Sequence, residues 1–461
     1  MEMETGTNMV SKQSKIKIGE KLAYSCGGFA NTILFGAMST FLLFFYTDVA
    51  KIDAALVGTI MLISRVLDGF IDISVGAIVD KTKSKQGKAR PWFLRICIPY
   101  AISGILLFTI PDFGNIGNII YIFLTYNFAN ICYSFLNIPF SVLNSTMTQD
   151  PGERAALGMF GAFAGVPSTL LVSMGTMPLV QALGGGPRAW QTVFLLLGIL
   201  SIILYSIIYK FTKERINSGV DGNGHSESVP FKVGLASLFK NKYWLMVIGE
   251  QILIQIVVAV SIGINIYYSQ YIFHDANLTG LLSLASFVPM MLGIFATAPF
   301  VKKYGKRNLA LAGGVVCLIG SALMIINSTA LPIILAGLVI RGVGAGMIGC
   351  LFNPLLADTT EYGEWKTGVK CEGLAFSAYS FANKAGGGLG SSALGWLLAI
   401  GGYVGGAATQ SEGAMTAIKA GQIYIPIVCF GLVVIIFSFY KLDKEYPMII
   451  EELKKRKAAN A

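Results

Sequence analysis

The chain has 461 residues, of which 54% are hydrophobic and 13% are charged, with a mean hydropathy of +0.65. Soluble globular chains carry about 25% charged residues, so this composition excludes a soluble enzyme and a disulfide-stapled secreted domain and indicates an all-α membrane protein. The formal net charge of +10 does not indicate nucleic acid, because the basic residues lie in short segments between apolar runs, as topology signals do.

Twelve apolar runs are long enough to cross a bilayer, which takes about 20 apolar residues. We predict membrane helices at residues 26–46, 54–79, 92–111, 118–143, 157–183, 191–211, 243–269, 278–301, 309–326, 331–356, 373–402 and 421–440. Residues 212–242 are the longest polar interruption. They are expected to form a cytoplasmic middle loop between two six-helix halves, 1–211 and 243–440, with a basic cytoplasmic tail at 441–461.

The distribution of Lys and Arg predicts the orientation of these helices. Most basic residues fall in the alternate segments that begin with the N-terminus, whereas the opposite segments hold Lys51, Arg188 and Lys419. Because basic loops stay on the cytoplasmic side, both termini are expected to be cytoplasmic. Residues 1–22 are polar and lack the short apolar core of a cleaved signal peptide, so the first predicted helix is expected to direct insertion.

Charged residues inside the predicted helices indicate function, since each costs about 2.5–3.5 kcal/mol on insertion. Asp68 and Asp72 lie four residues apart and share a helix face with Arg65. One interpretation is a coupling-ion site, where two carboxylates that repel each other take up a proton or a small cation. The alternative is an internal ion-pair network. Lys384 lies among closely spaced glycines that allow helix backbones to approach, and it needs an anion, either this acidic pair or the substrate.

Two other charged residues, Arg341 and Glu250, lie in predicted membrane helices. Arg341 is either an anchor for an acidic substrate or a packing device, and Glu250 is expected to reach the cytoplasmic interface. Planar hydrogen-bonding groups and aromatic faces recognise sugars, although Tyr and Asn also join membrane helices to one another. The candidate substrate-binding residues are Asn31, Thr32, Arg65, Tyr133, Asn137, Arg341, Tyr379, Ser380 and Lys384.

Several short motifs are distributed over the whole predicted membrane domain. They are Phe45-Tyr-Thr-Asp48-Val, Arg65-Val-Leu-Asp68-Gly-Phe-Ile-Asp72, Gly87-Lys-Ala-Arg-Pro-Trp92, Cys132-Tyr-Ser-Phe-Leu-Asn137-Ile-Pro-Phe140, Met147-Thr-Gln-Asp-Pro-Gly-Glu-Arg154, Ala357-Asp358-Thr-Thr-Glu361-Tyr-Gly-Glu364 and Cys371-Glu372-Gly. With these motifs the chain resembles the glycoside-pentoside-hexuronide:cation symporters of the major facilitator superfamily. The resemblance implies twelve transmembrane helices in two pseudo-symmetric halves that move around a central site. It also implies a monomer in the bacterial cytoplasmic membrane that binds a small sugar or glycoside.

The resemblance also assigns residues to roles. Asp68 and Asp72 correspond to the cation-binding aspartates of the family. Ser134 takes the place of a hydroxyl that faces the cation, and Lys384 that of a lysine near it. The residues that correspond to a cytoplasmic gate network of salt bridges are Asp80, Arg90, Arg154, Asp358, Glu361, Glu364 and Glu372.

Departures from the melibiose branch of the family bear on the substrate. Thr32 and Asn137 stand where that branch has carboxylates, and Asn31 replaces a lysine. A cavity that loses carboxylates while keeping Lys384 favours an anionic sugar such as a uronide over a galactoside. Together with the Asn-Ile-Pro motif, this places the chain nearer to the glucuronide permeases.

The coupling ion and the function class leave alternatives open. A sodium-using relative has an asparagine where this chain has Ile71, and a proton needs only one carboxylate, so a proton is favoured over sodium. An uncoupled sugar facilitator is a second alternative. A membrane prenyltransferase is a remote one, because it requires a second aspartate-rich motif. Seven cysteines without a Cys-x-x-Cys pair and two histidines predict no metal site and no cofactor. No enzymatic activity and no nucleic-acid partner are expected.

Overall fold

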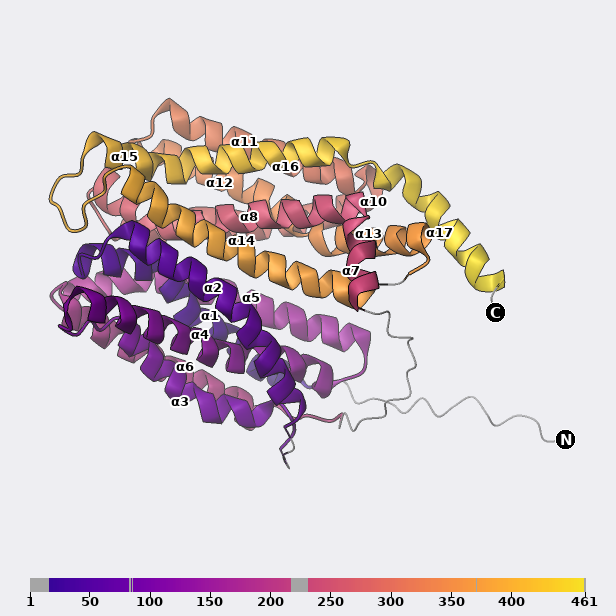
Figure 1. Ribbon diagram of the computed structural model, residues 1–461, viewed down its shortest axis with the longest axis horizontal. Helices are drawn as coiled ribbons and strands as arrows, with labels where there is room; N and C mark the ends of the chain where they lie inside the picture. The colour runs from indigo at the N-terminus through magenta and orange to yellow at the C-terminus, as the bar shows by residue number, and fades with distance from the viewer. Residues whose placement is uncertain (1–15, 83, 85, 217–230, 370, 460–461) are drawn as a thin grey trace. The chain divides into compact units, whose positions relative to one another are not determined.

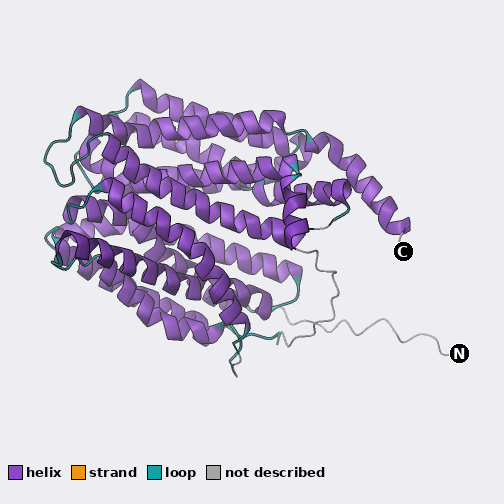
Figure 2. Cartoon of the chain, viewed as in Figure 1, coloured by secondary structure: helices purple, strands orange, loops and turns teal. Residues whose placement is uncertain are grey.

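The computed structural model describes residues 16–82, 84, 86–216, 231–369 and 371–459. All regular structure in these residues is helical, and they contain no strand (Figure 2). The all-α class is therefore confirmed. The chain divides into two compact units, one of Met1–Met38 with Phe70–Asn223 and the other of Ser39–Gly69 with Gly224–Ala461. The division into halves at residues 212–242 stays a prediction.

The first unit contains most of the first helix, the C-terminal part of the second helix and four complete helices. These are α1 (Ile18–Phe44), α2 (Ala54–Asp80), α3 (Arg90–Leu107), α4 (Gly114–Met147), α5 (Pro151–Ala182) and α6 (Pro187–Phe211). Proline in the first turn starts α3, α5 and α6, where the missing N–H costs nothing. The carboxylate of Asp150 also caps α5, accepting from the Gly152 N–H at 2.8 Å. Figure 1 shows α3 beside α4 and α6.

The second unit begins with the end of α1 and the first part of α2. Its other elements are η1 (Phe45–Val49), α7 (Phe231–Phe239), α8 (Lys242–Tyr267), η2 (Tyr268–Ile272), α9 (Leu278–Thr297), η3 (Ala298–Phe300), α10 (Val301–Tyr304), α11 (Lys306–Ile326), α12 (Leu331–Gly349), α13 (Phe352–Thr367), α14 (Glu372–Ile400), α15 (Glu412–Lys419), η4 (Ala420–Tyr424), α16 (Ile425–Phe439) and α17 (Leu442–Ala459). Asn241 caps α8 by accepting from the Trp244 N–H at 3.0 Å. Gly368, at φ +70°, ends α13.

The glycines of α14 bring this helix close to two neighbours. A Cβ on Gly386 would lie 2.8 Å from the carbonyl oxygen of Ile252 in α8, and one on Gly388 would lie 2.7 Å from Cβ of Arg65 in α2. The expectation that these glycines allow close approach is confirmed. Their spacing places Lys384, on the same helix, near the first part of α2.

Among the described residues, ten helical segments are long and apolar enough to cross a membrane. They are Ile18–Val49, Ala54–Asp80, Gly114–Met147, Gly152–Ala182, Pro187–Phe211, Lys242–Ile272, Leu278–Phe300, Lys306–Ile326, Leu331–Thr367 and Glu412–Phe439. The other two predicted segments, 92–111 and 373–402, overlap α3 and α14. Arginines lower the hydropathy of α3, and glycines with Lys384 lower that of α14.

Three segments of the second unit, η1, η2 and η4, are π-helical turns that continue or precede long α-helices. In η1 the Ala50 N–H donates to the Phe45 carbonyl at 2.9 Å, five residues back. Such wide turns are rare and occur frequently at functional sites. Two of them carry residues of a half-buried carboxylate cluster, and the third carries a partner of Arg341.

The two polar segments of the sequence contain helices. The predicted middle loop includes α7, while its residues 217–230 lie outside the described part of the chain. In the predicted tail, α17 buries Ile449 and Leu453 and leaves Lys455 exposed. The tail is therefore a helix with one face packed on the second unit.

Candidate functional site

In the second unit, a buried carboxylate lies between two basic side chains. Asp68 of α2 is 2% exposed. Its Oδ2 accepts a hydrogen bond from Nζ of Lys384 in α14 at 3.1 Å, and it lies 3.7 Å from Nη1 of Arg65, one turn earlier on α2. The sequence predicts that the anion beside Lys384 is either the pair Asp68 and Asp72 or the substrate. The structure shows Asp68 in contact with Lys384.

In the first unit, the other aspartate of α2 has a different partner. Ser134 of α4 is buried and donates a hydrogen bond to Oδ1 of Asp72 at 2.6 Å. Carboxylate and hydroxyl oxygens are ligands suited to a small hard cation, and the carboxylate alone suffices for a proton. The structure thus brings Ser134 to Asp72, and a role of the two residues in binding a cation stays a prediction.

Three polar side chains form a buried chain of hydrogen bonds in the first unit. The hydroxyl of Tyr205 in α6 donates to Oδ1 of Asn31 in α1 at 2.6 Å, and Nδ2 of Asn31 donates to Oδ1 of Asn137 in α4 at 3.4 Å. Tyr205 was not predicted from the sequence, because a tyrosine inside an apolar run has no distinguishing pattern. The chain fixes the orientation of both amides.

Other sugar-binding candidates make separate contacts within their own unit. The Thr32 hydroxyl donates to the Gly28 carbonyl of its own helix at 2.8 Å. The Tyr133 ring stacks on Phe35, with centroids 4.5 Å apart. In the second unit, the Tyr379 ring stacks on Phe352 at 4.1 Å, and Ser380 is exposed. A sugar-binding role for these residues stays a prediction.

The two predicted gate arginines of the first unit bind backbone carbonyls. Nε of Arg90 donates to the Tyr209 carbonyl at 3.2 Å, and Nε of Arg154 donates to the Thr148 carbonyl at 2.8 Å. Asp80 is exposed at the end of α2.

In the second unit, two of the predicted gate carboxylates have side-chain partners. Asp358 is buried and pairs with Lys306 at 2.6 Å, and Glu361 accepts from the Tyr446 hydroxyl. Glu364 is half-buried, and the side chain of Glu372 lies outside the described part. A gate network that links these residues stays a prediction.

Two acidic residues that the sequence analysis missed organise the loops of the first unit. The carboxylate of Glu214 accepts from the backbone N–H groups of Lys88, Ala89 and Arg90 at 2.9, 2.9 and 3.0 Å. Glu20 binds Arg215 through both oxygens at 2.8 and 2.6 Å. The hydrogen bond to Glu20 raises the pKa of Arg215 above its usual value.

A half-buried carboxylate, Asp48 in η1, joins three segments of the second unit. It accepts hydrogen bonds from the hydroxyls of Thr47 at 2.6 Å, of Tyr271 in η2, and of Tyr403 at 2.7 Å, the last in the loop after α14. The Gly406 N–H adds a fourth bond at 3.3 Å. We call these five residues the Asp48 cluster.

The Asp48 cluster also depends on a close backbone approach. A Cβ on Gly405 would collide with the Thr47 carbonyl oxygen, so a residue without a side chain is required there. The sequence signal that could have found the cluster is Asp48 itself, which ends an apolar run inside a motif shared with the family.

The structure contradicts the expectation for Glu250. This residue is 1% exposed in α8, and its Oε2 has no hydrogen-bond partner among the described residues. The expectation that it reaches the interface is wrong, because α8 begins at Lys242, two turns earlier, and Glu250 lies inside the bundle.

Replacement of Glu250 by Gln is therefore expected to change the free energy of unfolding by less than about 1 kcal/mol. Burying a charged carboxylate without a cation is costly, so an uncharged amide of the same shape should be tolerated. Thermal unfolding in detergent measures this, with Glu250→Lys as a strongly destabilised contrast. A loss above about 3 kcal/mol for Glu250→Gln would show that the carboxylate is paired as an ion.

The last predicted site residue, Arg341 of α12, is buried in the second unit and lines a pocket. The described residues contain no group of three or more His, Cys, Asp or Glu side chains that could hold a metal ion.

Comparison with known proteins gives matches over almost the whole chain. A family model described as MFS/sugar transport protein matches residues 23–444. The isoprimeverose transporter of Lactiplantibacillus pentosus is 33% identical over 455 residues, which cover 97% of this chain and 94% of that protein. A glucuronide carrier protein homolog of Escherichia coli (strain K12) is 32% identical over 448 residues, with 95% of each chain covered. Among solved structures, a D-xylose-proton symporter matches with a TM-score of 0.63 at 14% identity, covering 92% of this chain and 98% of that chain.

Proposed function

The chain belongs to the MFS/sugar transport protein family, as its resemblance to the glycoside-pentoside-hexuronide:cation symporters predicts, and we propose that it imports a sugar or glycoside together with a proton by alternating access. It is a multi-pass protein of the cell membrane. We further propose that α3 and α14 complete a set of twelve transmembrane helices, with both termini cytoplasmic. The protein acts as a monomer without a cofactor.

The observation that carries this proposal is the buried pairing of Asp68 with Lys384. A buried ion pair is costly unless both partners stay together. Neutralising one partner can therefore shift the equilibrium between two conformations of the transporter. When a proton neutralises a carboxylate of α2, the attraction that holds α14 weakens. Binding of the ion then shifts the population of conformations, and substrate binding shifts the same equilibrium.

The substrate proposal rests on the first unit and on the relatives. Thr32 and Asn137 stand where the melibiose branch has carboxylates, which leaves the cavity without negative charge at these positions. One relative is named for isoprimeverose and another for a glucuronide. We propose a pentoside or a glucuronide as the substrate class.

The test is uptake into proteoliposomes with an imposed proton or sodium gradient. The panel contains isoprimeverose, a glucuronide and an α-galactoside. Accumulation of one of the first two sugars under the proton gradient is expected. Entry of sugar to equilibrium under either gradient, without accumulation, would identify an uncoupled facilitator instead.

Replacement of Ser134 by Ala tests the choice of ion. A proton needs only the carboxylate of Asp72, so accumulation driven by a proton gradient should stay within about threefold of wild type, as expected for one hydrogen bond of about 0.5 kcal/mol. Sodium needs several oxygen ligands, so a sodium symporter would lose accumulation. Ser145→Ala is the matched control, because Ser145 is exposed on the same helix. A selective loss in Ser134→Ala would favour sodium.

A further inference from the structure

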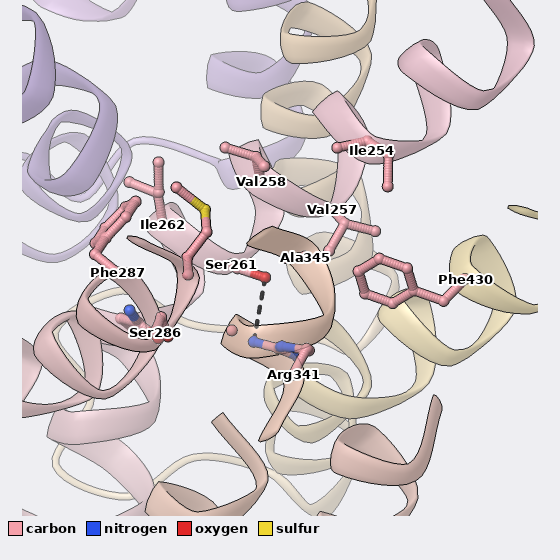
Figure 3. Close-up of a pocket in the computed structure, with 13 residues that line it drawn as sticks. Ile254, Val257, Val258, Ser261, Ile262, Ser286, Phe287, Arg341, Ala345 and Phe430 are labelled. Carbon is pink, nitrogen blue, oxygen red and sulfur yellow. Dashed lines mark hydrogen bonds between the residues drawn. The ribbon is translucent and has the colours of Figure 1, made fainter. Parts of the chain in front are cut away.

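A pocket lies among four helices of the second unit, α8, α9, α12 and α16 (Figure 3). Its lining includes Val257 and Ser261 from α8, Phe287 from α9, Arg341 and Ala345 from α12, and Phe430 from α16. Figure 3 shows Phe287 and Phe430 on opposite sides, with Arg341 between them. Most of the wall is apolar, and Arg341 supplies its only charge among the described lining residues.

Arg341 is 5% exposed and has no carboxylate partner among the described residues. Its Nη1 donates to the Gln422 carbonyl at 2.8 Å, and its Nη2 donates a long bond of 3.4 Å to Oγ of Ser261. A guanidinium has five N–H donors, and these two neutral acceptors leave its charge uncompensated. A buried charge without a counter-charge is costly, so the position calls for an anion.

The neighbours of Arg341 hold the guanidinium in place. Gln422 is fully buried in the π-helical turn η4, and its Nε2 donates to Oδ1 of Asn265 at 3.1 Å. Oε1 of the same Gln422 side chain is buried without a partner. The wide turn directs a backbone carbonyl at Arg341, so the site is ordered before any ligand binds.

We propose that this pocket binds a monoanion with an apolar body, such as a carboxylate or phosphate diester that carries an alkyl or aryl group. The anion pairs with Arg341, and the apolar body lies against Phe287 and Phe430. Apolar walls suit such a body better than the hydroxyls of a sugar. The ligand is either a free organic acid or an anionic lipid of the bilayer. The inference does not rest on the coupling role of Asp68 or on the identity of the transported sugar.

Equilibrium dialysis of the full chain in nanodiscs of zwitterionic lipid tests the proposal. The probe is 4-phenylbutyrate, and the neutral comparison is 4-phenylbutanol. We expect saturable binding of the acid and no saturable binding of the alcohol. Arg341→Gln should weaken binding of the acid about 10- to 100-fold, as expected for a charged hydrogen-bonded pair.

Two further variants keep the test decisive. Ala345→Phe fills the pocket while keeping Arg341, so it should lose binding even if Arg341→Gln does not fold. Arg188→Gln, at an exposed arginine in the first turn of α6, should bind as wild type. Equal binding of acid and alcohol would overturn the proposal, as would wild-type binding by Ala345→Phe or an equal loss in Arg188→Gln.

A second pair of nanodiscs identifies the source of the ligand. Phosphatidylglycerol in the bilayer should compete with 4-phenylbutyrate if the natural ligand is a lipid. Unchanged binding in its presence would indicate a free acid. Both outcomes require the anion-binding pocket at Arg341.

Discussion

Replacement of Asp68 by Asn should abolish accumulation of the sugar that wild type concentrates under a proton gradient. One pH unit corresponds to about 1.36 kcal/mol, which permits about tenfold accumulation if one proton enters with each sugar. The variant cannot exchange a charged carboxylate for a neutral one beside Lys384. We therefore expect it to equilibrate the sugar at about the external concentration, measured as the plateau of uptake in proteoliposomes.

The controls for Asp68→Asn separate coupling from folding. Asp53→Asn removes an exposed carboxylate at the start of the same helix and should accumulate sugar as wild type does. Because Asp68→Asn leaves Lys384 without its partner, the double variant Asp68→Asn with Lys384→Gln removes both charges. It should fold at least as well as the single variant and still fail to accumulate sugar. Normal accumulation in either of these variants would assign the pair a purely structural role.

The pairing at Asp68 was open to prediction because the membrane restricts where charges can lie. Few acids fall inside apolar runs, and each needs a partner there. Lys384 was one of the few cations available, so its pairing with an acid of α2 could be expected without coordinates. The glycines around Lys384 were informative for the same reason, since only close helix packing gives small residues an advantage.

The partners of Asp48 in its cluster could not be predicted from the sequence. Asp48 is separated from Tyr271 by 223 residues and from Tyr403 by 355 residues. Tyrosines near the ends of apolar runs are usual at membrane interfaces, so neither marked a buried contact. The π-helical turns that direct these side chains also have no sequence pattern. The prediction that Glu250 reaches the interface was wrong for a related reason. The position of a residue in an apolar run does not reveal whether it lies on the buried face of its helix.

A second large effect on transport is expected from substitutions in the Asp48 cluster, because this cluster joins the end of α1 to η2 and to the loop after α14. Asp48→Ala should lower the initial rate of sugar uptake at least about tenfold. The substitution leaves the hydroxyls of Tyr271 and Tyr403 without the acceptor Asp48, and each unsatisfied donor that stays away from water costs about 1–3 kcal/mol. Burial raises the pKa of Tyr403 above its usual range, so its hydroxyl stays a donor at all pH values used for uptake.

A milder substitution in the same cluster tests whether the loss of uptake rate follows the number of hydrogen bonds removed. Tyr403→Phe keeps the carboxylate and removes one donor worth about 1 kcal/mol, so its uptake rate should fall by a smaller factor of about five. Asp53→Asn is the matched control, because Asp53 is an exposed cap of α2 only five residues away. It should transport sugar at the wild-type rate. A wild-type rate in Asp48→Ala would contradict the prediction.

Rate and stability together decide what the Asp48 cluster does. If it only holds the second unit together, the uptake rate of each variant should follow the fraction of folded protein, and the thermal midpoint should fall in the same order. If the cluster closes one end of the transport path, it must open and close in every cycle, and a lost hydrogen bond then shifts the ratio of the two states. Asp48→Ala should in that case lose uptake beyond its loss of folded protein. We expect this second result, because the cluster joins short π-helical turns and a glycine loop, which can separate without unfolding a long helix.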